Sequence, residues 1–163
     1  MKALFKIVGG ILVLLILALV VLSITGFPPK DRRPGLWIKG DLVTTPVTDW
    51  SYTNKIRTIE VQTNTWYFVP HSVTIFCIFY NGQLYLASIV PPGGAKYPGG
   101  RIWDQMVARD PRVRLKIGNQ LFDRTLRYVT DPVEHDGVIA AQTKKYPEYK
   151  YAAGSAFNVF RIE

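Results

Sequence analysis

The sequence predicts a mainly β protein, an antiparallel sheet rolled into a closed or half-closed barrel with two short helices, preceded by one transmembrane helix. Three observations support this prediction. An uncharged apolar run occupies the start of the chain, strand-like segments with period-two alternation follow it, and strands do not alternate with helices as a parallel sheet requires. A closed barrel also removes exposed sheet edges, which a plain β-sandwich, the alternative, leaves open.

The apolar run covers residues 7–24, eighteen consecutive residues without a charge. As a helix it would extend roughly 27 Å, about the hydrocarbon thickness of a bilayer. A cleaved signal peptide is the competing interpretation, because Lys2 and Lys6 form a basic start. However, the apolar core is longer than such signals have, and the only acceptable cleavage sequence, Val21-Leu22-Ser23, lies inside it. We therefore expect an uncleaved anchor over residues 1–26.

Positive charge flanks both ends of this anchor, so its orientation is nearly balanced. Lys2 and Lys6 precede it, and Lys30, Arg32 and Arg33 follow it. A short basic segment before a first hydrophobic span usually stays in the cytoplasm. We therefore expect a single-pass protein of a bacterial inner membrane, with membrane lipid as a partner and the C-terminal domain in the periplasm.

A proline-rich basic segment, residues 27–35, separates the anchor from the rest of the chain. Its prolines cannot continue the helix, so we interpret it as a linker. Residues 36–163 are enough for one domain. The formal net charge of +8 is spread along the chain without a stacking platform or a helix-turn-helix pattern, which disfavours nucleic-acid binding.

Two hairpins are the clearest elements of this domain. In the first, strands at 72–80 and 83–89 flank Asn81-Gly82, a pair typical of a type I′ turn. In the second, residues 112–129 form two strands around Gly118-Asn119, and the first of these strands points apolar side chains inward and basic ones outward. Further strands are predicted at 36–43, 58–62 and 157–162.

Two short helices complete the prediction. The first covers 102–109 and ends at Asp110-Pro111, because proline disfavours helical geometry in the residue before it. The second follows Asp131, a candidate N-cap, has Pro132 at its first position, and runs to about Lys145.

In this order, the motifs resemble those of the split β-barrel proteins, which include pyridoxamine-phosphate-oxidase-like flavoproteins and deazaflavin-dependent nitroreductases. The resemblance runs from about residue 56 to residue 149. It rests on Ile59-Glu60-Val61-Gln62-Thr63, Ser72-Val73-Thr74, residues 81–88, Trp103, residues 109–115, Val129-Thr130-Asp131 and Lys144-Lys145-Tyr146. It implies a split antiparallel β-barrel and a homodimer with flavin sites between the subunits.

The resemblance also implies which residues hold a cofactor, FMN or a deazaflavin. The corresponding positions lie on the first long hairpin, in the loop after it and at the start of the short helix, and are Thr63, Thr65, His71, Ser72, Ser88, Lys96, Arg101 and Trp103. Such groups suit the task, because a phosphate takes charge-assisted donors and a helix N-terminus, while a flavin ring takes an apolar wall. The protein would then be a membrane-tethered oxidoreductase that serves a lipophilic acceptor.

One departure from the family pattern leaves an alternative open. Where many members carry a basic Gly-Arg-Lys-Ser-type turn, residues 64–70 contain three aromatics and no cation. The loop at 91–101 bears Lys96 and Arg101 but lacks the ending of a nucleotide P-loop. In the alternative, no cofactor is bound and the protein is a non-catalytic accessory subunit of a larger membrane complex, with Gly9-Gly10 permitting close approach of another subunit's helix.

Few residues offer nucleophilic or metal chemistry. Cys77 is the single cysteine and lies in an apolar run, so we expect a core position. With only two histidines, no metal site of ordinary ligand spacing can be drawn, and we assign no catalytic residue. Six aromatics of the early domain are interpreted either as core or as an interfacial or protein-contact surface: Trp37, Trp50, Tyr52, Trp66, Tyr67 and Phe68.

Overall fold

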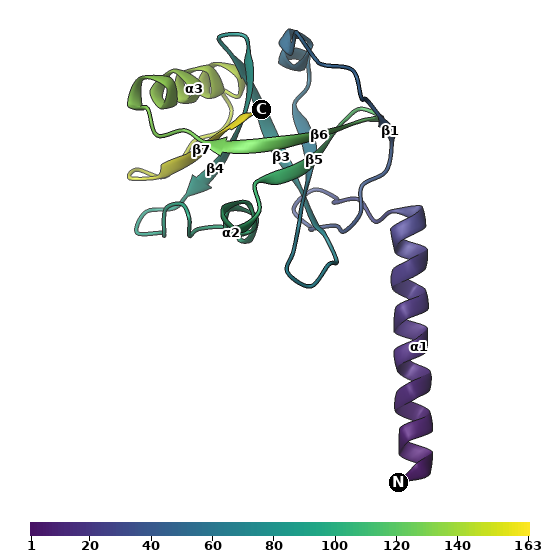
Figure 1. Ribbon diagram of the computed structural model, residues 1–163. Coiled ribbons are helices and arrows are strands. Elements are labelled where there is room, and N and C mark those ends of the chain that lie inside the picture. Colours follow the sequence, from purple (N-terminus) through teal and green to yellow (C-terminus); the bar gives the residue numbers. More distant parts are fainter.

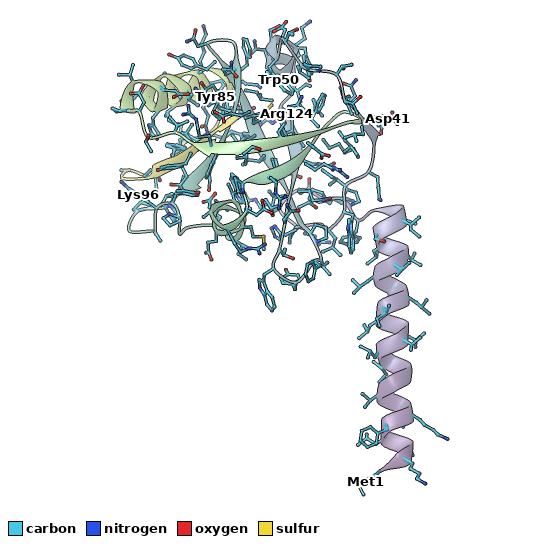
Figure 2. All side chains as sticks on the ribbon, in the orientation of Figure 1. Met1, Asp41, Trp50, Tyr85, Lys96 and Arg124 are labelled. Atoms are coloured by element: carbon cyan, nitrogen blue, oxygen red, sulfur yellow. The ribbon has the colours of Figure 1, made fainter.

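A long helix precedes a closed β-barrel in the computed structural model, which describes residues 1–163 (Figure 1). The helix, α1 (Lys2–Thr25), stands apart from the barrel, and none of its residues is buried (Figure 2). With 24 residues and a mean hydropathy of 3.2 over its most apolar part, it is long and apolar enough to cross a membrane. The predicted anchor is therefore helical.

Six antiparallel strands form the barrel: β2 (Thr58–Thr63), β3 (His71–Tyr80), β4 (Gln83–Val90), β5 (Arg112–Ile117), β6 (Gln120–Tyr128) and β7 (Ala156–Ile162). They pair in the order β6-β5-β2-β3-β4-β7, and β7 pairs again with β6 to close the ring. The predicted antiparallel barrel is confirmed, and the closure excludes the sandwich.

Both predicted hairpins are confirmed. Asn81 and Gly82 have φ angles of 47° and 79°, the left-handed values that a type I′ turn requires at both central positions. Gly118 has a φ of 63° in the turn between β5 and β6. The alternation predicted for β5 is also confirmed, since its buried side chains are Val113, Leu115 and Ile117.

The strand predicted at 36–43 is largely wrong, because only β1 (Asp41–Leu42) forms a ladder, parallel to the start of β6. The reason is the shortage of free sheet edges. β5 pairs on both sides, and β7 bonds only the later part of β6, so the start of β6 is free to pair with residues 41 and 42, while the start of β3 is bridged by Gly35. The rest of the segment crosses the outside of the barrel as a strap, where the Ile38 N–H donates to the Gln62 side chain (2.9 Å).

Residues 27–35, interpreted from the sequence as a linker, are hydrogen-bonded to the domain. The Phe27 N–H donates to the Trp37 carbonyl (2.8 Å), and Gly35 and Ser72 exchange two backbone hydrogen bonds (2.8 and 2.9 Å). Gly35 has no space for a side chain, because a Cβ there would overlap the Phe27 carbonyl. The segment thus connects α1 to the barrel through fixed contacts.

Both predicted helices are confirmed with their bounds, as α2 (Ile102–Arg109) and α3 (Pro132–Lys145). Asp131 caps α3 by accepting a hydrogen bond from the Val133 N–H (3.0 Å). A short 3₁₀ helix, η1 (Ser51–Lys55), is an element that the sequence did not predict.

Two buried apolar clusters stabilise the domain. The larger fills the barrel, and α2 contributes Trp103 and Val107 to it. The smaller lies between the sheet and α3, which contributes Val138. Cys77 is fully buried in the larger cluster, as its apolar surroundings in the sequence predicted.

The early aromatic residues divide between the two interpretations. Trp50 is 5% exposed and packs edge-on against Phe122, with ring centroids 5.4 Å apart. Trp66 and Phe68 are 75% and 94% exposed and belong to the loop between β2 and β3. Trp50 is therefore a core residue, as one interpretation predicted, while Trp66 and Phe68 lie on the surface.

Candidate functional site

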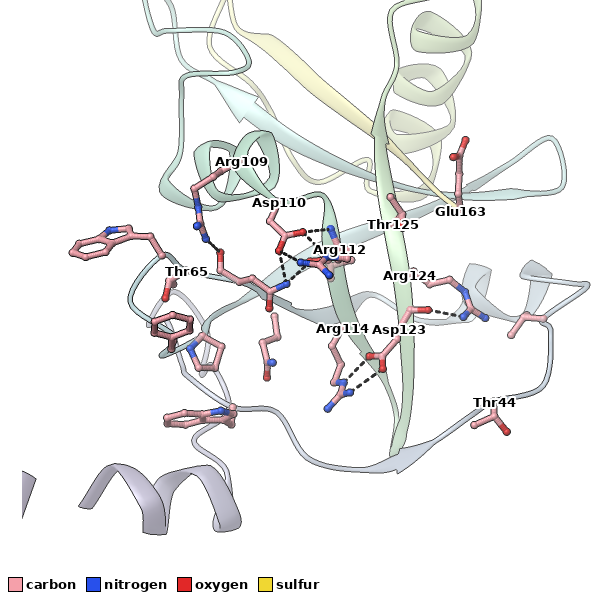
Figure 3. A pocket seen from close by; sticks show the side chains of 18 of the residues that line it. Thr44, Thr65, Arg109, Asp110, Arg112, Arg114, Asp123, Arg124, Thr125 and Glu163 are labelled. Carbon is pink, nitrogen blue, oxygen red and sulfur yellow. Dashed lines mark hydrogen bonds and ion pairs between the residues drawn. The ribbon is translucent and has the colours of Figure 1, made fainter. Parts of the chain in front are cut away.

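An open groove of about 1380 Å³ runs over the outer face of β2, β5 and β6 (Figure 3). One wall is formed by Trp37 of the strap and by residues 44–47, which follow the strap in the chain. The β2–β3 loop forms another wall. Its lining is Trp37, Thr44, Thr45, Pro46, Val47, Gln62, Asn64, Thr65, Trp66, Phe68, Pro70, Arg109, Asp110, Arg112, Val113, Arg114, Asp123, Arg124, Thr125 and Glu163. This size can take a drug-sized ligand.

Two of the four groove arginines are neutralised by carboxylates. Arg112 donates two side-chain hydrogen bonds to Asp110 (2.9 and 2.8 Å), and Arg114 holds Asp123 in the same bidentate way (2.7 and 2.8 Å). The hydrogen bonds from Arg112 lower the pKa of Asp110 well below its usual range, and those from Arg114 lower the pKa of Asp123. The first pair lies where α2 passes into β5, and the second joins β5 to β6 along the groove.

The other two arginines have no carboxylate partner. Arg109 donates to the Asn64 carbonyl (2.8 Å), and Arg124 donates to the Asp123 carbonyl (2.8 Å) while its guanidinium lies over the Trp50 ring (5.7 Å). Each keeps further N–H donors and its full charge for an anion. Figure 3 shows them toward opposite ends of the groove.

The loop end of the groove combines aromatic and uncharged polar groups. Trp66 and Phe68 contribute apolar surface there, and Thr65 lies beside them (Figure 3). The Thr65 hydroxyl donates to the Val69 carbonyl (2.6 Å), which leaves its oxygen lone pairs as acceptors. An apolar wall next to cationic donors suits a ligand that is planar at one end and anionic at the other.

The first four predicted cofactor residues lie near this loop but face different ways. Thr65 lines the groove. Ser72 is fully buried and pairs with Gln62, a groove residue, so both are on the outer face of the sheet. Thr63 and His71 pair on the opposite face, where the Thr63 hydroxyl donates to the His71 carbonyl (3.0 Å) and burial lowers the pKa of the imidazole.

The other four predicted residues lie at or near α2, outside the groove, around a carboxyl group that the sequence analysis did not single out. Asp104 is fully buried, and its Oδ2 accepts hydrogen bonds from the Ser88 hydroxyl (2.8 Å), the Asn158 amide (3.0 Å) and the Arg101 backbone N–H (3.3 Å). Burial raises the pKa of Asp104, and the hydrogen bonds from Ser88 and Asn158 oppose that rise. We call these residues the Asp104 cluster.

The Asp104 cluster is hydrogen-bonded within itself, except that the buried Oδ1 of Asp104 has no partner. Trp103 is buried in the barrel core, while Lys96 and the Arg101 side chain lie exposed around the cluster. A phosphate at this place would meet a buried carboxyl whose hydrogen-bond donors are already committed. The structure thus separates the eight predicted residues, and only Thr65 lies in the groove.

The groove arginines were missed as a site, although one signal pointed to them. The alternation of β5 placed Arg112 and Arg114 on its outer face, and the sequence showed that this face is basic. Arg109 and Arg124 join them only because α2 packs against β2 and β6 pairs with β5. The pairing of β5 with β6 belongs to the predicted hairpin, whereas the packing of α2 against β2 joins residues distant in the chain and cannot be seen in local patterns.

Comparisons with known proteins identify the fold. No family model and no curated protein matches the sequence. A conserved hypothetical protein from Mycobacterium tuberculosis superimposes with a TM-score of 0.52 at 16% identity, over 82% of this chain and 85% of that one. A protein described as a domain-swapped dimer gives 0.52 at 22% identity, over 66% and 81%, and an F420-H2-dependent reductase gives 0.49 at 21%, over 66% and 95%.

These likenesses concern the fold alone, since all of these identities are low. Together with the closed six-stranded ring, they confirm the split β-barrel that the sequence resemblance implied. Function has to be argued from the site.

Proposed function

We propose that the protein is a membrane-anchored split-barrel protein whose groove binds a phosphorylated planar cofactor, FMN or a deazaflavin. One observation carries this proposal: two guanidinium groups without carboxylate partners share the groove with exposed aromatic rings. The sequence resemblance to split-barrel flavoproteins supports the choice of cofactor. Since that resemblance also implies sites between subunits, we propose a homodimer in which the groove face lies at or near the interface.

The residues present fit such a cofactor at the groove and not at the Asp104 cluster. Arg109 or Arg124 would hold the phosphate, and Thr65 and Asn64 would orient polar edges of the ring system beside the aromatic wall. When bound, the cofactor would supply hydride or electron transfer. The contribution of the chain would be to bind it, orient it and limit its exposure to water.

The site can be tested by titrating FMN, and separately a deazaflavin, with the full chain in mild detergent. Binding in the groove should change the cofactor's fluorescence and shift its absorbance band, because the ring leaves water for an aromatic wall. An unchanged spectrum with both cofactors at saturating protein would refute the proposal. Arg109→Gln should weaken the response, while the matched variant Arg32→Gln, in the 27–35 segment outside the groove, should not.

The anchoring in a membrane is part of this proposal. The length and hydropathy of α1 support a span, and the basic residues before it support a cytoplasmic N-terminus with the barrel in a bacterial periplasm. A cysteine introduced at Val133, which is exposed on α3, should react with a membrane-impermeant maleimide in intact inner-membrane spheroplasts. Reaction only after the membrane is permeabilised would place the barrel in the cytoplasm.

The accessory-subunit alternative is favoured by one observation on α1. Gly9 and Gly10 are adjacent and carry no side chain, so the backbone of another transmembrane helix could approach α1 closely at this position. Gly9→Leu should then abolish co-purification of a stable partner in mild detergent, and Leu4→Ile, a conservative change in the same helix, should not. Isolated protein at all concentrations would contradict this alternative.

A further inference from the structure

The β2–β3 loop (residues 64–70) exposes large aromatic side chains. Trp66 is 75% exposed and Phe68 is 94% exposed, and Tyr67 packs edge-on against Trp66 with centroids 5.3 Å apart. Single exposed apolar residues are common on protein surfaces, but three consecutive aromatics at a loop tip form a contiguous apolar patch, which marks an interaction site.

The loop is held in this conformation rather than left free to collapse onto the barrel. At its base, Asn64 donates to the Asp110 carboxylate (3.0 Å) and its carbonyl accepts from Arg109 (2.8 Å). Across the loop, the Thr65 hydroxyl donates to the Val69 carbonyl (2.6 Å). Phe68 has a φ of 64°, a left-handed conformation that is strained for a bulky side chain and is tolerated where function requires it.

The loop projects from the barrel on the side where α1 leaves it. Figure 1 shows its tip reaching past the C-terminal end of α1, alongside the last turns of the helix, and Figure 2 shows its side chains pointing away from the barrel, toward the N-terminal end of α1. The exposed Lys30, Arg32 and Arg33 lie at the same junction, immediately after α1. The hydrogen bonds between residues 27–35 and the barrel hold the C-terminal end of α1 beside the β2–β3 loop.

These features together match the chemistry of a bilayer surface. Trp and Tyr accumulate at the headgroup level, where an apolar ring body and a polar edge are both accommodated. Cationic side chains beside them are attracted to anionic headgroups. A soluble partner would explain the exposed rings, but it would not explain why the loop lies beside the last turns of a helix that is long and apolar enough to cross a membrane.

We propose that the β2–β3 loop is a second membrane contact, which places Trp66, Tyr67 and Phe68 in the interfacial region of the bilayer that α1 spans. The inference rests on the proposed anchoring of α1, and it uses Trp66 and Phe68, which also line the groove. The barrel would be attached at two points and would have one orientation relative to the membrane.

A depth measurement on the full chain tests this proposal. Single cysteines at Phe68, at Val133 on α3 and at Leu14 within α1 are labelled with the fluorophore NBD, since the native Cys77 is buried and does not compete. The protein is reconstituted into nanodiscs of phosphatidylcholine and phosphatidylglycerol, with or without nitroxide-labelled lipid. We expect loss of emission at Phe68→Cys and Leu14→Cys, and none at Val133→Cys, which is a matched exposed apolar position.

The other outcomes overturn the inference in distinguishable ways. Quenching at Leu14→Cys with none at Phe68→Cys would leave α1 as the only membrane contact. No quenching at either position would refute the anchoring and the loop inference with it. A label at Phe68→Cys that is shielded from iodide in the buffer but not quenched by nitroxide lipid would identify a protein surface as the occupant.

A second variant asks whether the aromatic rings cause the insertion. NBD is placed at Tyr67→Cys, alone and together with Trp66→Ser and Phe68→Ser. Lipid quenching should be lost in the triple variant, because the loop then has no apolar surface to bury. The matched control combines Tyr67→Cys with Val133→Ser and should keep its quenching. Equal quenching in all three proteins would contradict the proposal.

Discussion

The Asp104 cluster and the groove are both polar, yet they differ in how their hydrogen bonds are used. In the cluster, the Oδ2 of a fully buried carboxyl group accepts from Ser88, Asn158 and the start of α2, while its Oδ1 has no partner, so most of the hydrogen bonds are made within the cluster. In the groove, Arg109 and Arg124 keep donors that no carboxylate neutralises. Polar residue types therefore do not define a site. What distinguishes a binding site is unused hydrogen-bonding capacity next to an open volume.

The largest effect on stability is expected when the central carboxyl group of the Asp104 cluster is removed. Asp104→Ala should lower the free energy of unfolding by about 3 kcal/mol, because three donors lose their acceptor inside the protein. Urea denaturation of the detergent-solubilised chain, followed by near-ultraviolet circular dichroism, measures this change. Ser88→Ala, which removes only one of those donors, should cost less. A loss below about 1 kcal/mol for Asp104→Ala would show that the cluster is not structural.

Cofactor affinity should depend on the groove arginines and not on the Asp104 cluster. Arg109→Gln or Arg124→Gln should weaken cofactor binding by roughly tenfold, since a charge-assisted hydrogen bond is worth about 1.5–3 kcal/mol. Lys96→Gln and Arg101→Gln, at the exposed border of the Asp104 cluster, are the matched controls and should bind as the wild type does. Fluorescence titration decides between the two regions, and a stronger effect of the Lys96 and Arg101 changes would return the phosphate site to the loop at 91–101.

Lowering the pH should reduce the stabilising contribution of Asp110 in the groove and increase that of Asp104 in the cluster. Arg112 lowers the pKa of Asp110, so the contribution of this carboxylate to stability is present above its ordinary value of 3.8 and is lost as the pH falls through the lowered pKa. Burial raises the pKa of Asp104, so its contribution is full below 3.8 and is lost as the pH rises through the raised pKa.

Two asparagine variants measure these signs. The cost of Asp110→Asn should shrink from neutral pH to acid, and the cost of Asp104→Asn should grow. Thermal unfolding of both variants and the wild type between about pH 3 and about pH 7 gives the two slopes. Parallel slopes would mean that the carboxyl groups do not have contrasting environments.

The smallest effect is expected from a groove ion pair. Arg114 and Asp123 are 37% and 55% exposed, so Arg114→Gln should change the free energy of unfolding by only about 0.5 kcal/mol despite its bidentate geometry. The same denaturation experiment measures it. A loss as large as that of Asp104→Ala would show that this ion pair is structural in the way that the cluster is.

Local sequence signals were sufficient for most of the fold. Asn81-Gly82 specified a turn whose twist matches its strands, and Asp131-Pro132 specified a helix start, because in both cases the decisive contacts lie within a few residues. The strand predicted at 36–43 failed because its pairing depends on which sheet edges the closed barrel leaves free. Local alternation carries no information on that.

The candidate site was less predictable for a similar reason. Thr65 was identified through the family resemblance, but the strap and α2, which complete the groove, reach it through contacts between residues distant in the chain. Asp104 has the sequence context of an ordinary acidic residue in the first turn of a helix. Only its burial beneath Ser88 and Asn158 shows that this part of the barrel is occupied by its own side chains.

The close packing at Gly35 has a mechanical consequence. Because backbone hydrogen bonds hold residues 27–35 against β3, rotation of α1 about its axis would turn the barrel with it instead of being absorbed by a slack tether. Gly35→Val should uncouple the two motions, since any side chain there displaces the Phe27 backbone. A turn of α1 would then no longer be passed to the groove, whose lining includes Trp37, two residues after Gly35.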